Sequence, residues 1–423
     1  MSLLAVVISM LVLFALNMRL YLAMLLAVFV YFAFFSSMPL MIAVQRIIAP
    51  SQNASLLAIP FFVLLGTLLG LTGVAQRLLR LADLLVGRLA GGLGHTNVML
   101  STLMGGISAS NLADAAMMCR MLVPEMERQG YSRGTAAAIT ACSSLITPII
   151  PPGIALIIYG IVADVSIGSM FVAGILPGIM LCGLLLLTVW LVAKQRGYKP
   201  SRETRPSAAE VKTTVFGSWP ALLLVVVIIG GIRFGVFTPT EAGAVATLAA
   251  LVIGLFIYRE MKFSDLAGAF GDTARQTASI LLVIMASSAL SFIFSSERTG
   301  VYLASWITGL SDSPWVFLIA INLLLLFLGM LIEGTALIII LVPLLKPAVM
   351  QLGIDPVHFG IVVIFNLSIG TLTPPVGTVL LLVCNLTKTA LGDFLREGWP
   401  FLLALMVGLL AVTFVPFLSL AFV

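Results

Sequence analysis

Long stretches without a charged side chain dominate the pattern of apolar and polar positions along this chain. The 22 basic and 17 acidic residues separate twelve uncharged windows of 17 residues or more, which together hold 294 of the 423 residues. An α-helix needs about 20 apolar residues to cross a bilayer, so most of these windows are candidate spans. The pattern therefore predicts an all-α polytopic membrane protein.

Composition supports this prediction and excludes a soluble globular domain. Apolar residues make up 61% of the chain and charged residues only 9%, whereas soluble domains carry about 25% charged residues. Residues 1–18 lack a basic start and a small-residue cleavage site, so we expect a first span there rather than a signal peptide. The four cysteines and two histidines show no spacing typical of disulfide frameworks, zinc sites or haem sites.

The distribution of basic residues predicts how the chain is oriented. The only strongly polar connection, 194–212, holds six basic residues against two acidic ones. Basic loops stay on the cytoplasmic side, and this run lacks the interleaved aromatic residues of a nucleic-acid site, so we place it inside the cell. With this loop fixed, the best split has 18 basic residues inside and 4 outside.

That split requires the window 89–113 to enter the membrane and return as a re-entrant hairpin. Its second half is rich in glycine, serine and asparagine. Polar backbone at membrane depth is tolerated only where it is buried in protein or lines a cavity, so the hairpin implies a substrate or ion route. Under this topology both termini lie on the side of the membrane opposite the basic loop.

The sequence repeats itself at an offset of 223 residues. Gly106 matches Gly329, and the pair Pro151 and Pro152 matches Pro374 and Pro375. Each copy predicts a polar-tipped hairpin followed by a helix that the two prolines break. The copies cross the membrane in opposite directions, and such inverted repeats are typical of secondary transporters.

The repeats divide the chain into six expected segments: N-terminal scaffold helices (1–88), a first transport repeat (89–163), central scaffold helices with the cytoplasmic loop (164–275), connecting scaffold helices (276–312), a second transport repeat (313–387) and a C-terminal helix (388–423).

The two helix breaks carry candidate chemistry for a cation. A proline leaves carbonyl groups without intrahelical partners, and in lipid these are costly unless something binds them. A dehydrated sodium ion needs several such oxygens. Hydroxyl or amide oxygens nearby come from Ser143, Ser144 and Thr147 in the first copy and from Asn366, Ser368, Thr371 and Thr373 in the second. A pair of kinked helices packed through small residues is the alternative.

The hairpin tips offer complementary chemistry for an anion. A half-helix that begins at the membrane midplane directs unpaired N–H groups and a positive dipole end towards it. Asp114 and Glu333 lie close to the tips. Intramembrane acids are functional candidates, but a carboxylate that only caps a hairpin turn is an equally good interpretation.

Four segments resemble the large membrane subunit of tripartite ATP-independent periplasmic (TRAP) transporters, in the ion transporter superfamily. They are GGISASNLADAA (105–116), ITPIIPPGIALIIYG (146–160), FTPTEAGAVA (237–246) and GIDPVHFGIVVIFNLSIGTLTPPVG (353–377). The resemblance implies an elevator-type transporter, driven by sodium, that takes organic acids such as C4-dicarboxylates, sialic acid or sugar acids from a periplasmic binding protein. It also implies a location in the bacterial inner membrane, so that both termini are expected to be periplasmic. A small four-span membrane subunit is expected as a separate chain, and no enzyme activity is expected.

The resemblance also implies which residues bind what. Two sodium sites are expected, one per repeat, and no organic cofactor. The first would comprise Gly106, Ser108, Asn111, Ser144, Thr147 and Pro148, and the second Gly334, Gly370, Thr371 and Thr373. The substrate anion would contact Ser108, Ser110, Asn111, Glu333 and Thr335.

Two other functions fit parts of the sequence. A stand-alone sodium symporter for anions would need no binding protein. An intramembrane serine protease is a remote alternative, because Gly106, Ile107 and Ser108 match a GxS pattern that would need His358 as partner.

The orientation can be tested with fusions to alkaline phosphatase, which is active only outside the cytoplasm. We expect activity when the enzyme follows Val423 and none when it is inserted near Arg205, because the basic loop is cytoplasmic. An active fusion at Arg205 would overturn the whole orientation.

Overall fold

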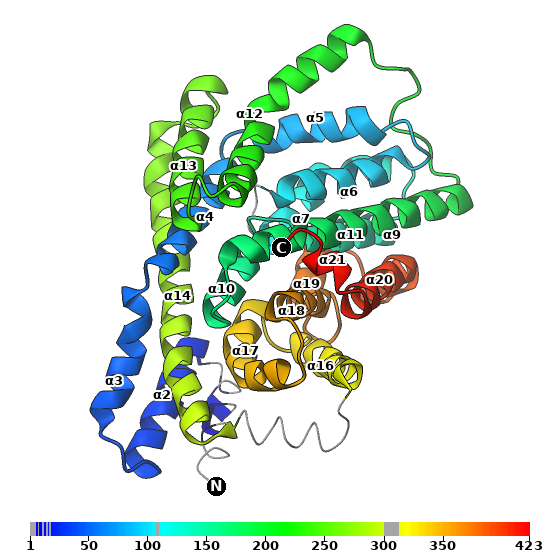
Figure 1. The fold of residues 1–423 in the computed structure, drawn as a ribbon. Helices are drawn as coiled ribbons and strands as arrows, with labels where there is room; N and C mark the ends of the chain where they lie inside the picture. The colour runs from blue at the N-terminus through cyan, green and yellow to red at the C-terminus, as the bar shows by residue number, and fades with distance from the viewer. Residues whose placement is uncertain are drawn as a thin grey trace.

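The computed structural model describes residues 18–106, 110–299 and 313–423, together with 6, 8–10, 12, 13 and 16, and within them it is all-helical (Figure 1). The helices are α2 (Leu20–Phe34), α3 (Leu40–Ile48), α4 (Ala58–Leu69), α5 (Val74–Val86), α6 (Gly92–Gly105), α7 (Asn111–Met121), α8 (Val123–Arg128), α9 (Arg133–Ser143), α10 (Ile154–Val162), α11 (Ile167–Arg196), α12 (Ala208–Arg233), α13 (Pro239–Val252), α14 (Phe263–Ser296), α16 (Pro314–Gly329), α17 (Gly334–Gln351), α18 (Pro356–Gly370), α19 (Thr378–Thr387), α20 (Leu391–Phe414) and α21 (Phe417–Leu420). Single turns occur at η1 (Ala49–Gln52), η2 (Ala54–Leu57), η3 (Ser144–Ile146) and η4 (Ile253–Ile257).

The helices confirm a polytopic membrane protein. Six helices in the described part of the chain are long and apolar enough to cross a membrane. A seventh span results if the two segments Leu40–Gln52 and Ala54–Leu69, bent by 57° at their junction, count as one. Helix α14 continues across the expected segment boundary at 275/276, and most of the expected first span, 1–18, lies outside the described residues.

The internal repeat is present in the helices themselves. The expected repeats, 89–163 and 313–387, hold α6 to α10 and α16 to α19, and the helices that follow them, α11 and α20, begin at Ile167 and Leu391, within one residue of equivalent positions, and extend each repeat by one helix. Helices α7 and α17 begin at Asn111 and Gly334, and helices α9 and α18 begin at Arg133 and Pro356, so both pairs begin 223 residues apart. Each repeat has a hairpin followed by a helix that breaks before a double proline, which confirms the predicted architecture.

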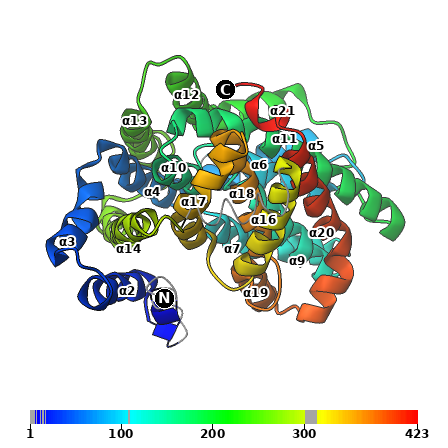
Figure 2. The same ribbon diagram turned by 60° about the horizontal axis from the view of Figure 1, so that its bottom comes forward.

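The two repeats exchange helices where they meet (Figures 1 and 2). In each repeat the first arm of the hairpin packs on the helix before the break of the same repeat, α6 on α9 and α16 on α18. The second arm packs on the helix after the break of the other repeat, α7 on α19 and α17 on α10. Because of this exchange, α7, α10, α17 and α19 hold the two repeats together as one structural unit.

A separate apolar core holds the N-terminal helices. Side chains of α2 and α3 pack against α14, and the buried members of this cluster include Tyr31, Phe32 and Ile293. Helix α14 also packs against α4 and α17. It therefore connects the N-terminal helices to the unit that the repeats form.

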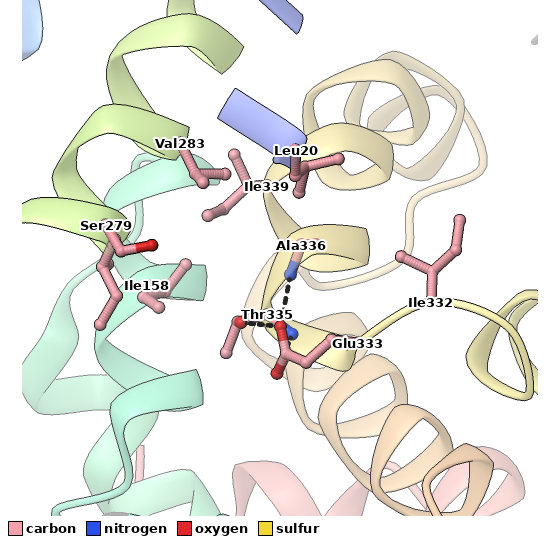
Figure 3. A pocket seen from close by; sticks show the side chains of 10 residues that line it. Leu20, Ile158, Ser279, Val283, Ile332, Glu333, Thr335, Ala336 and Ile339 are labelled. Carbon is pink, nitrogen blue, oxygen red and sulfur yellow. Dashed lines mark hydrogen bonds between the residues drawn. The ribbon is translucent and has the colours of Figure 1, made fainter. Parts of the chain in front are cut away.

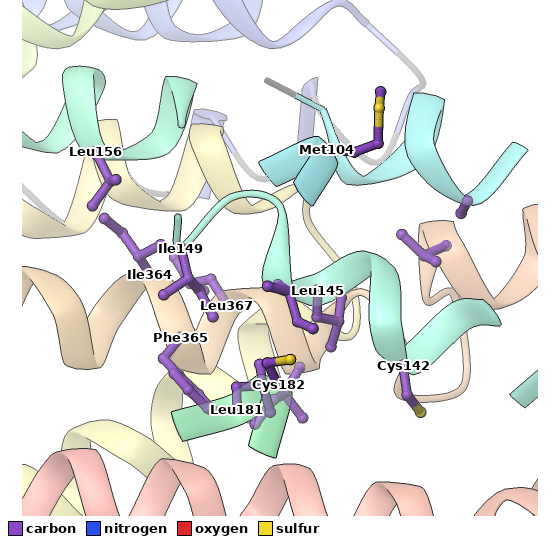
Figure 4. Packing of buried hydrophobic residues seen from close by; sticks show 14 of the residues in the cluster. Met104, Cys142, Leu145, Ile149, Leu156, Leu181, Cys182, Ile364, Phe365 and Leu367 are labelled. Atoms are coloured by element: carbon purple, nitrogen blue, oxygen red, sulfur yellow. The ribbon is translucent and has the colours of Figure 1, made fainter. Parts of the chain in front are cut away.

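The main core surrounds the helix breaks. Figure 4 shows Leu145 and Ile149, from the first break, close to Ile364 and Leu367 of α18. Elsewhere in this core, α16 and α18 approach so closely that a Cβ atom on Gly370 would lie 2.8 Å from the Cα of Gly329. Only glycine permits this contact between two backbones.

Buried amide side chains connect each hairpin to the helix before its break. Asn97 on α6 donates a hydrogen bond to Thr140 of α9 (2.8 Å) and accepts one from Ser143 (2.8 Å). In the second repeat, Asn366 on α18 donates to the side-chain oxygen of Asn322 on α16 (2.7 Å). These bonds satisfy polar groups that would otherwise be costly in an apolar interior.

The loop that follows α11 is fastened to the joint between α5 and α6. The Ser201 amide donates to the Gly87 carbonyl (2.9 Å), and the Ser201 hydroxyl donates to Asp83 (2.6 Å). Arg202 pairs with both Asp83 and Glu210. Hydrogen bonds to these two carboxylates raise the pKa of Arg202, so it stays ionised.

The Asn322 network predicts a measurable effect on stability. Asn322→Ala should lower the free energy of unfolding by about 1 kcal/mol, because Asn366 and Thr413 lose a buried hydrogen-bond partner. Thermal unfolding of the purified chain in detergent would measure this. Leu323→Ala is the matched control, because Leu323 is 65% exposed on the same helix. Equal destabilisation by both substitutions would contradict the role of the network.

Candidate functional site

One cavity of about 170 Å³ lies where the two repeats meet. It is lined by both hairpins, by residues on both sides of the helix breaks, and by α14, namely Ser110, Asn111, Leu112, Pro148, Ile154, Ala155, Gln276, Ile280, Glu333, Gly334, Thr335, Ile338, Ile364, Leu367, Ser368, Thr371 and Thr378. A second cavity of about 230 Å³ adjoins it and shares Ile280, Glu333 and Thr335 (Figure 3). The two cavities together form the candidate functional site.

Four helices begin at this cavity. Lining residues include Asn111 at the start of α7, Ile154 of α10, Gly334 of α17 and Thr378 of α19. The first N–H groups of a helix have no intrahelical partner and carry the positive end of the helix dipole. The described lining residues include no lysine or arginine. Positive potential in this lining therefore comes from backbone groups, at the starts of α7 and α10, because Glu333 caps α17 and the Thr371 carbonyl accepts hydrogen bonds from the first amides of α19.

The two hairpin tips are capped by different side chains. Ser110 caps α7 and accepts a hydrogen bond from the Ala113 amide (3.4 Å). Glu333 caps α17 and accepts from the amides of Thr335 (3.0 Å) and Ala336 (3.2 Å) and from the Thr335 hydroxyl. Figure 3 shows these bonds at the cavity wall. The capping interpretation of Glu333 is thus confirmed, although the same carboxylate also lines both cavities.

Asp114 has a different environment from Glu333. It lies inside α7, is 1% exposed, and accepts hydrogen bonds on Oδ2 from Ser101 (2.9 Å) and Thr147 (2.9 Å). Its other oxygen, Oδ1, is buried without a hydrogen-bond partner among the described residues. Asp114 therefore joins both hairpin arms to the first helix break and keeps one oxygen available.

The second helix break is closed by its own backbone. The Thr371 carbonyl accepts hydrogen bonds from the amides of Val379 (3.1 Å) and Leu380 (3.2 Å), beyond the break. The hydroxyls of Thr371 and Thr373 donate to the carbonyls of Ser368 (2.6 Å) and Ile369 (3.0 Å). A hydroxyl that donates in this way still has lone pairs for a cation.

The structure brings together most of the residues that the sequence singled out. Of the expected substrate contacts, Ser110, Asn111, Glu333 and Thr335 line the cavity, and Ser108 lies outside the described residues. Of the expected sodium ligands, Asn111, Pro148, Gly334 and Thr371 also line it. The other expected ligands lie in the walls behind the cavity or at the end of α6, namely Gly106, Ser144, Thr147, Gly370 and Thr373.

Some polar residues of the site were not expected from the sequence. Gln276 and Thr378 line the cavity, and Ser101 holds the buried Asp114, whereas Ser368, which also lines the cavity, was among the expected oxygen donors of the second break. Thr378 lies next to the stretch of polar residues around the second break, which is a signal that could have found it. Gln276 and Ser101 lie outside both breaks, and only the packing of the helices brings them to the site.

Comparison with known proteins identifies relatives along nearly the whole chain. The chain is 39% identical to the sialic acid TRAP transporter large permease protein SiaM of Vibrio cholerae, covering 88% of this chain and 87% of the relative. It is 36% identical to the C4-dicarboxylate TRAP transporter large permease protein DctM of Pseudomonas aeruginosa (89% and 88%). It is 37% identical to the 2,3-diketo-L-gulonate TRAP transporter large permease protein YiaN of Escherichia coli (89% and 88%).

The fold is similar to that of a solved transporter as well. The crystal structure of the Alcanivorax borkumensis YdaH transporter matches with a TM-score of 0.58 and 17% identity, covering 84% of each chain.

The relatives are permeases and not enzymes, which excludes the intramembrane protease. The model of the family described as "Tripartite ATP-independent periplasmic transporter, DctM component" matches residues 7–418. The chain therefore belongs to the DctM component family of TRAP transporters, as its sequence motifs predicted.

Proposed function

We propose that this chain carries a small organic anion across the bacterial inner membrane by sodium-coupled, elevator-type movement. In this proposal it receives the anion from a periplasmic binding protein and works with a separate small four-span subunit. The observation that carries the proposal is that four helices, two from each repeat, begin at one cavity, and that two of them, α7 and α10, begin there without a carboxylate as N-cap. Such N-termini bind carboxylates and phosphates through backbone N–H groups.

The names of the relatives support a carboxylate as the anion. They are named for sialic acid, C4-dicarboxylates and 2,3-diketo-L-gulonate. The cavity walls also offer hydroxyl and amide groups, from Ser110, Asn111 and Thr335, that can form hydrogen bonds with such acids. The volumes of the two cavities suit a small molecule rather than a peptide.

The chemistry of the donor groups supports one sodium site in each repeat. Two buried oxygens near the breaks, Oδ1 of Asp114 and Oδ1 of Asn366, have no hydrogen-bond partner among the described residues. Buried acceptors without partners are costly, and a cation would satisfy them. We therefore add Asp114 to the proposed first site and place the Asn366 oxygen, already a candidate from the sequence, in the proposed second site beside Gly370, Thr371 and Thr373.

Charge arithmetic favours two ions over one. Moving a monoanion into a cell held at about −100 mV costs roughly 2.3 kcal/mol, and each entering sodium ion returns about the same amount. One sodium ion thus only balances the substrate charge. A second makes uptake electrogenic and directed inwards, and the two inverted helix breaks supply one site each.

The packing of the helices supports movement of the repeats as one body. Because α7 packs on α19 and α17 packs on α10, the cavity belongs to both repeats and cannot divide without breaking these contacts. The helices α2 and α3 with α14 have a core of their own. The elevator proposal assigns the repeats to the moving body and these helices to the scaffold.

The proposal predicts that the chain alone does not transport. Proteoliposomes should accumulate the labelled organic acid only when the small subunit and the loaded binding protein are both present, with sodium outside. Robust uptake by the chain alone would favour the stand-alone symporter. Unchanged uptake with a proton gradient in sodium-free buffer would refute sodium coupling.

The proposed second sodium site predicts a specific defect. Thr373→Ala removes a hydroxyl oxygen but leaves the proline break, so the sodium concentration for half-maximal uptake should rise several-fold while expression is unchanged. Thr188→Ala is the matched control, because Thr188 makes the same bond to the carbonyl four residues earlier, far from the break. Equal sodium dependence in both variants would remove Thr373 from the site.

A further inference from the structure

The two hairpin tips differ in charge at equivalent positions. Glu333 and Ser110 are 223 residues apart, which is the offset of the repeat, and each is the N-cap of the second arm of its hairpin. Both residues line the cavity of about 170 Å³ where the two repeats meet. One tip therefore presents a carboxylate to the cavity where the other presents a hydroxyl.

This difference makes the cavity electrically polar. The N-terminus of a helix carries about half a positive charge, and a full carboxylate at the cap outweighs it. The α17 tip thus presents a negative charge at the cavity wall. The cap of α7 is the uncharged Ser110, and Asp114, the carboxylate in the first turn of α7, is buried and does not line the cavity. Glu333 is the only charged side chain among the described residues that line the two cavities. No cationic side chain in that lining compensates it.

We propose that Glu333 orients and selects the substrate. The carboxylate of the substrate binds on the side of the first repeat, at the starts of α7 and α10, and the far end of the substrate donates hydrogen bonds to Glu333. Glu333 is exposed to the cavity, and its carboxylate has lone pairs beyond those that cap α17.

This orientation defines a chemical class. A hydroxylated monocarboxylate, such as a sugar acid, satisfies both ends of the cavity. A dicarboxylate of the same length places its second charge against Glu333, and juxtaposed like charges oppose binding. The inference rests on the proposed function, since it assumes that the substrate binds in this cavity.

Two six-carbon acids test the selection directly. D-Gluconate and D-glucarate differ at one end only, where a hydroxymethyl group in the first is a carboxylate in the second. Binding of each acid to the purified chain with its small subunit, in saturating sodium, is measured by calorimetry without the binding protein, so that only the membrane site selects. We expect D-gluconate to bind at least about 10-fold more tightly than D-glucarate.

Variants of Glu333 separate its charge from its role as a cap. Glu333→Gln and Glu333→Ser both keep an oxygen that can cap α17, and Ser is the residue at the equivalent tip. Both variants should weaken binding of D-gluconate and strengthen binding of D-glucarate, so that the two affinities come within about 3-fold. Asp265→Asn is the control, because Asp265 is also an acid in the first turn of a helix, where it accepts a hydrogen bond from the Lys262 amide, but it does not line either cavity.

Three results would overturn the proposal. They are equal binding of both acids by the unmodified protein, an unchanged preference in both Glu333 variants, and binding of neither acid. None of these affects sodium-driven uptake of the acid delivered by the binding protein, which tests the proposed function separately. Loss of that uptake, with the preference for D-gluconate intact, would refute the proposed function and leave the role of Glu333 standing.

Discussion

Every backbone N–H and C=O group inside a membrane needs a partner, and the rest of this structure depends on how that requirement is met. Two helices break at paired prolines, and two hairpins turn within the apolar part of the chain. Some of the resulting free groups are satisfied locally, as when the Thr371 carbonyl bonds to amides across the second break. Others face the cavity, where four helices begin. The same irregularities that are costly in lipid therefore create a polar surface at the junction of the repeats.

The exchange of helices between repeats explains why this surface stays in place. A single hairpin with its broken helix would leave one side of its tip uncovered. Packing α7 on α19 and α17 on α10 covers both tips with the opposite repeat. The contact of Gly329 with Gly370 then holds α16 and α18 together without intervening side chains. Binding groups from distant parts of the sequence are thus held by the same contacts that stabilise the fold.

Much of the fold could be predicted from local sequence rules. Uncharged windows and paired prolines are local signals, and the repeat offset is a regular spacing. The positions of the helices, their breaks and the two repeats agree with these signals. The rules failed where packing overrides local preference. Helix α14 includes Arg275, because its first turns extend beyond the apolar window, and α17 continues through Pro343 and Pro347, which neighbouring helices tolerate. The match at offset 223 pairs Pro347 with Pro124, but the two prolines have different positions. Pro347 lies inside α17, whereas Pro124 lies in the first turn of α8.

The candidate site was less predictable, because its contacts join residues far apart in the sequence. Ser101 and Thr147 lie 13 and 33 residues from Asp114, and no local pattern indicates that both bond to one carboxylate oxygen. For Glu333 the sequence left two interpretations open, a functional acid or a helix cap. The structure shows the cap, and the cap lines the cavity. The two interpretations were not exclusive, because the residue that caps the hairpin turn also lines the cavity.

The fastening of the loop after α11 to the joint between α5 and α6 has a mechanical consequence. The chain enters the first repeat at this joint and leaves the repeat through this loop. Because Ser201 and Arg202 bind Gly87 and Asp83, the segment that leads into the first repeat and the loop that leaves it are held together at one place. Two independent linkers would let the repeat translate and rotate separately, whereas one common pivot couples these motions. Any displacement of the first repeat relative to α12 must therefore follow an arc about this pivot or first break the pair between Asp83 and Arg202.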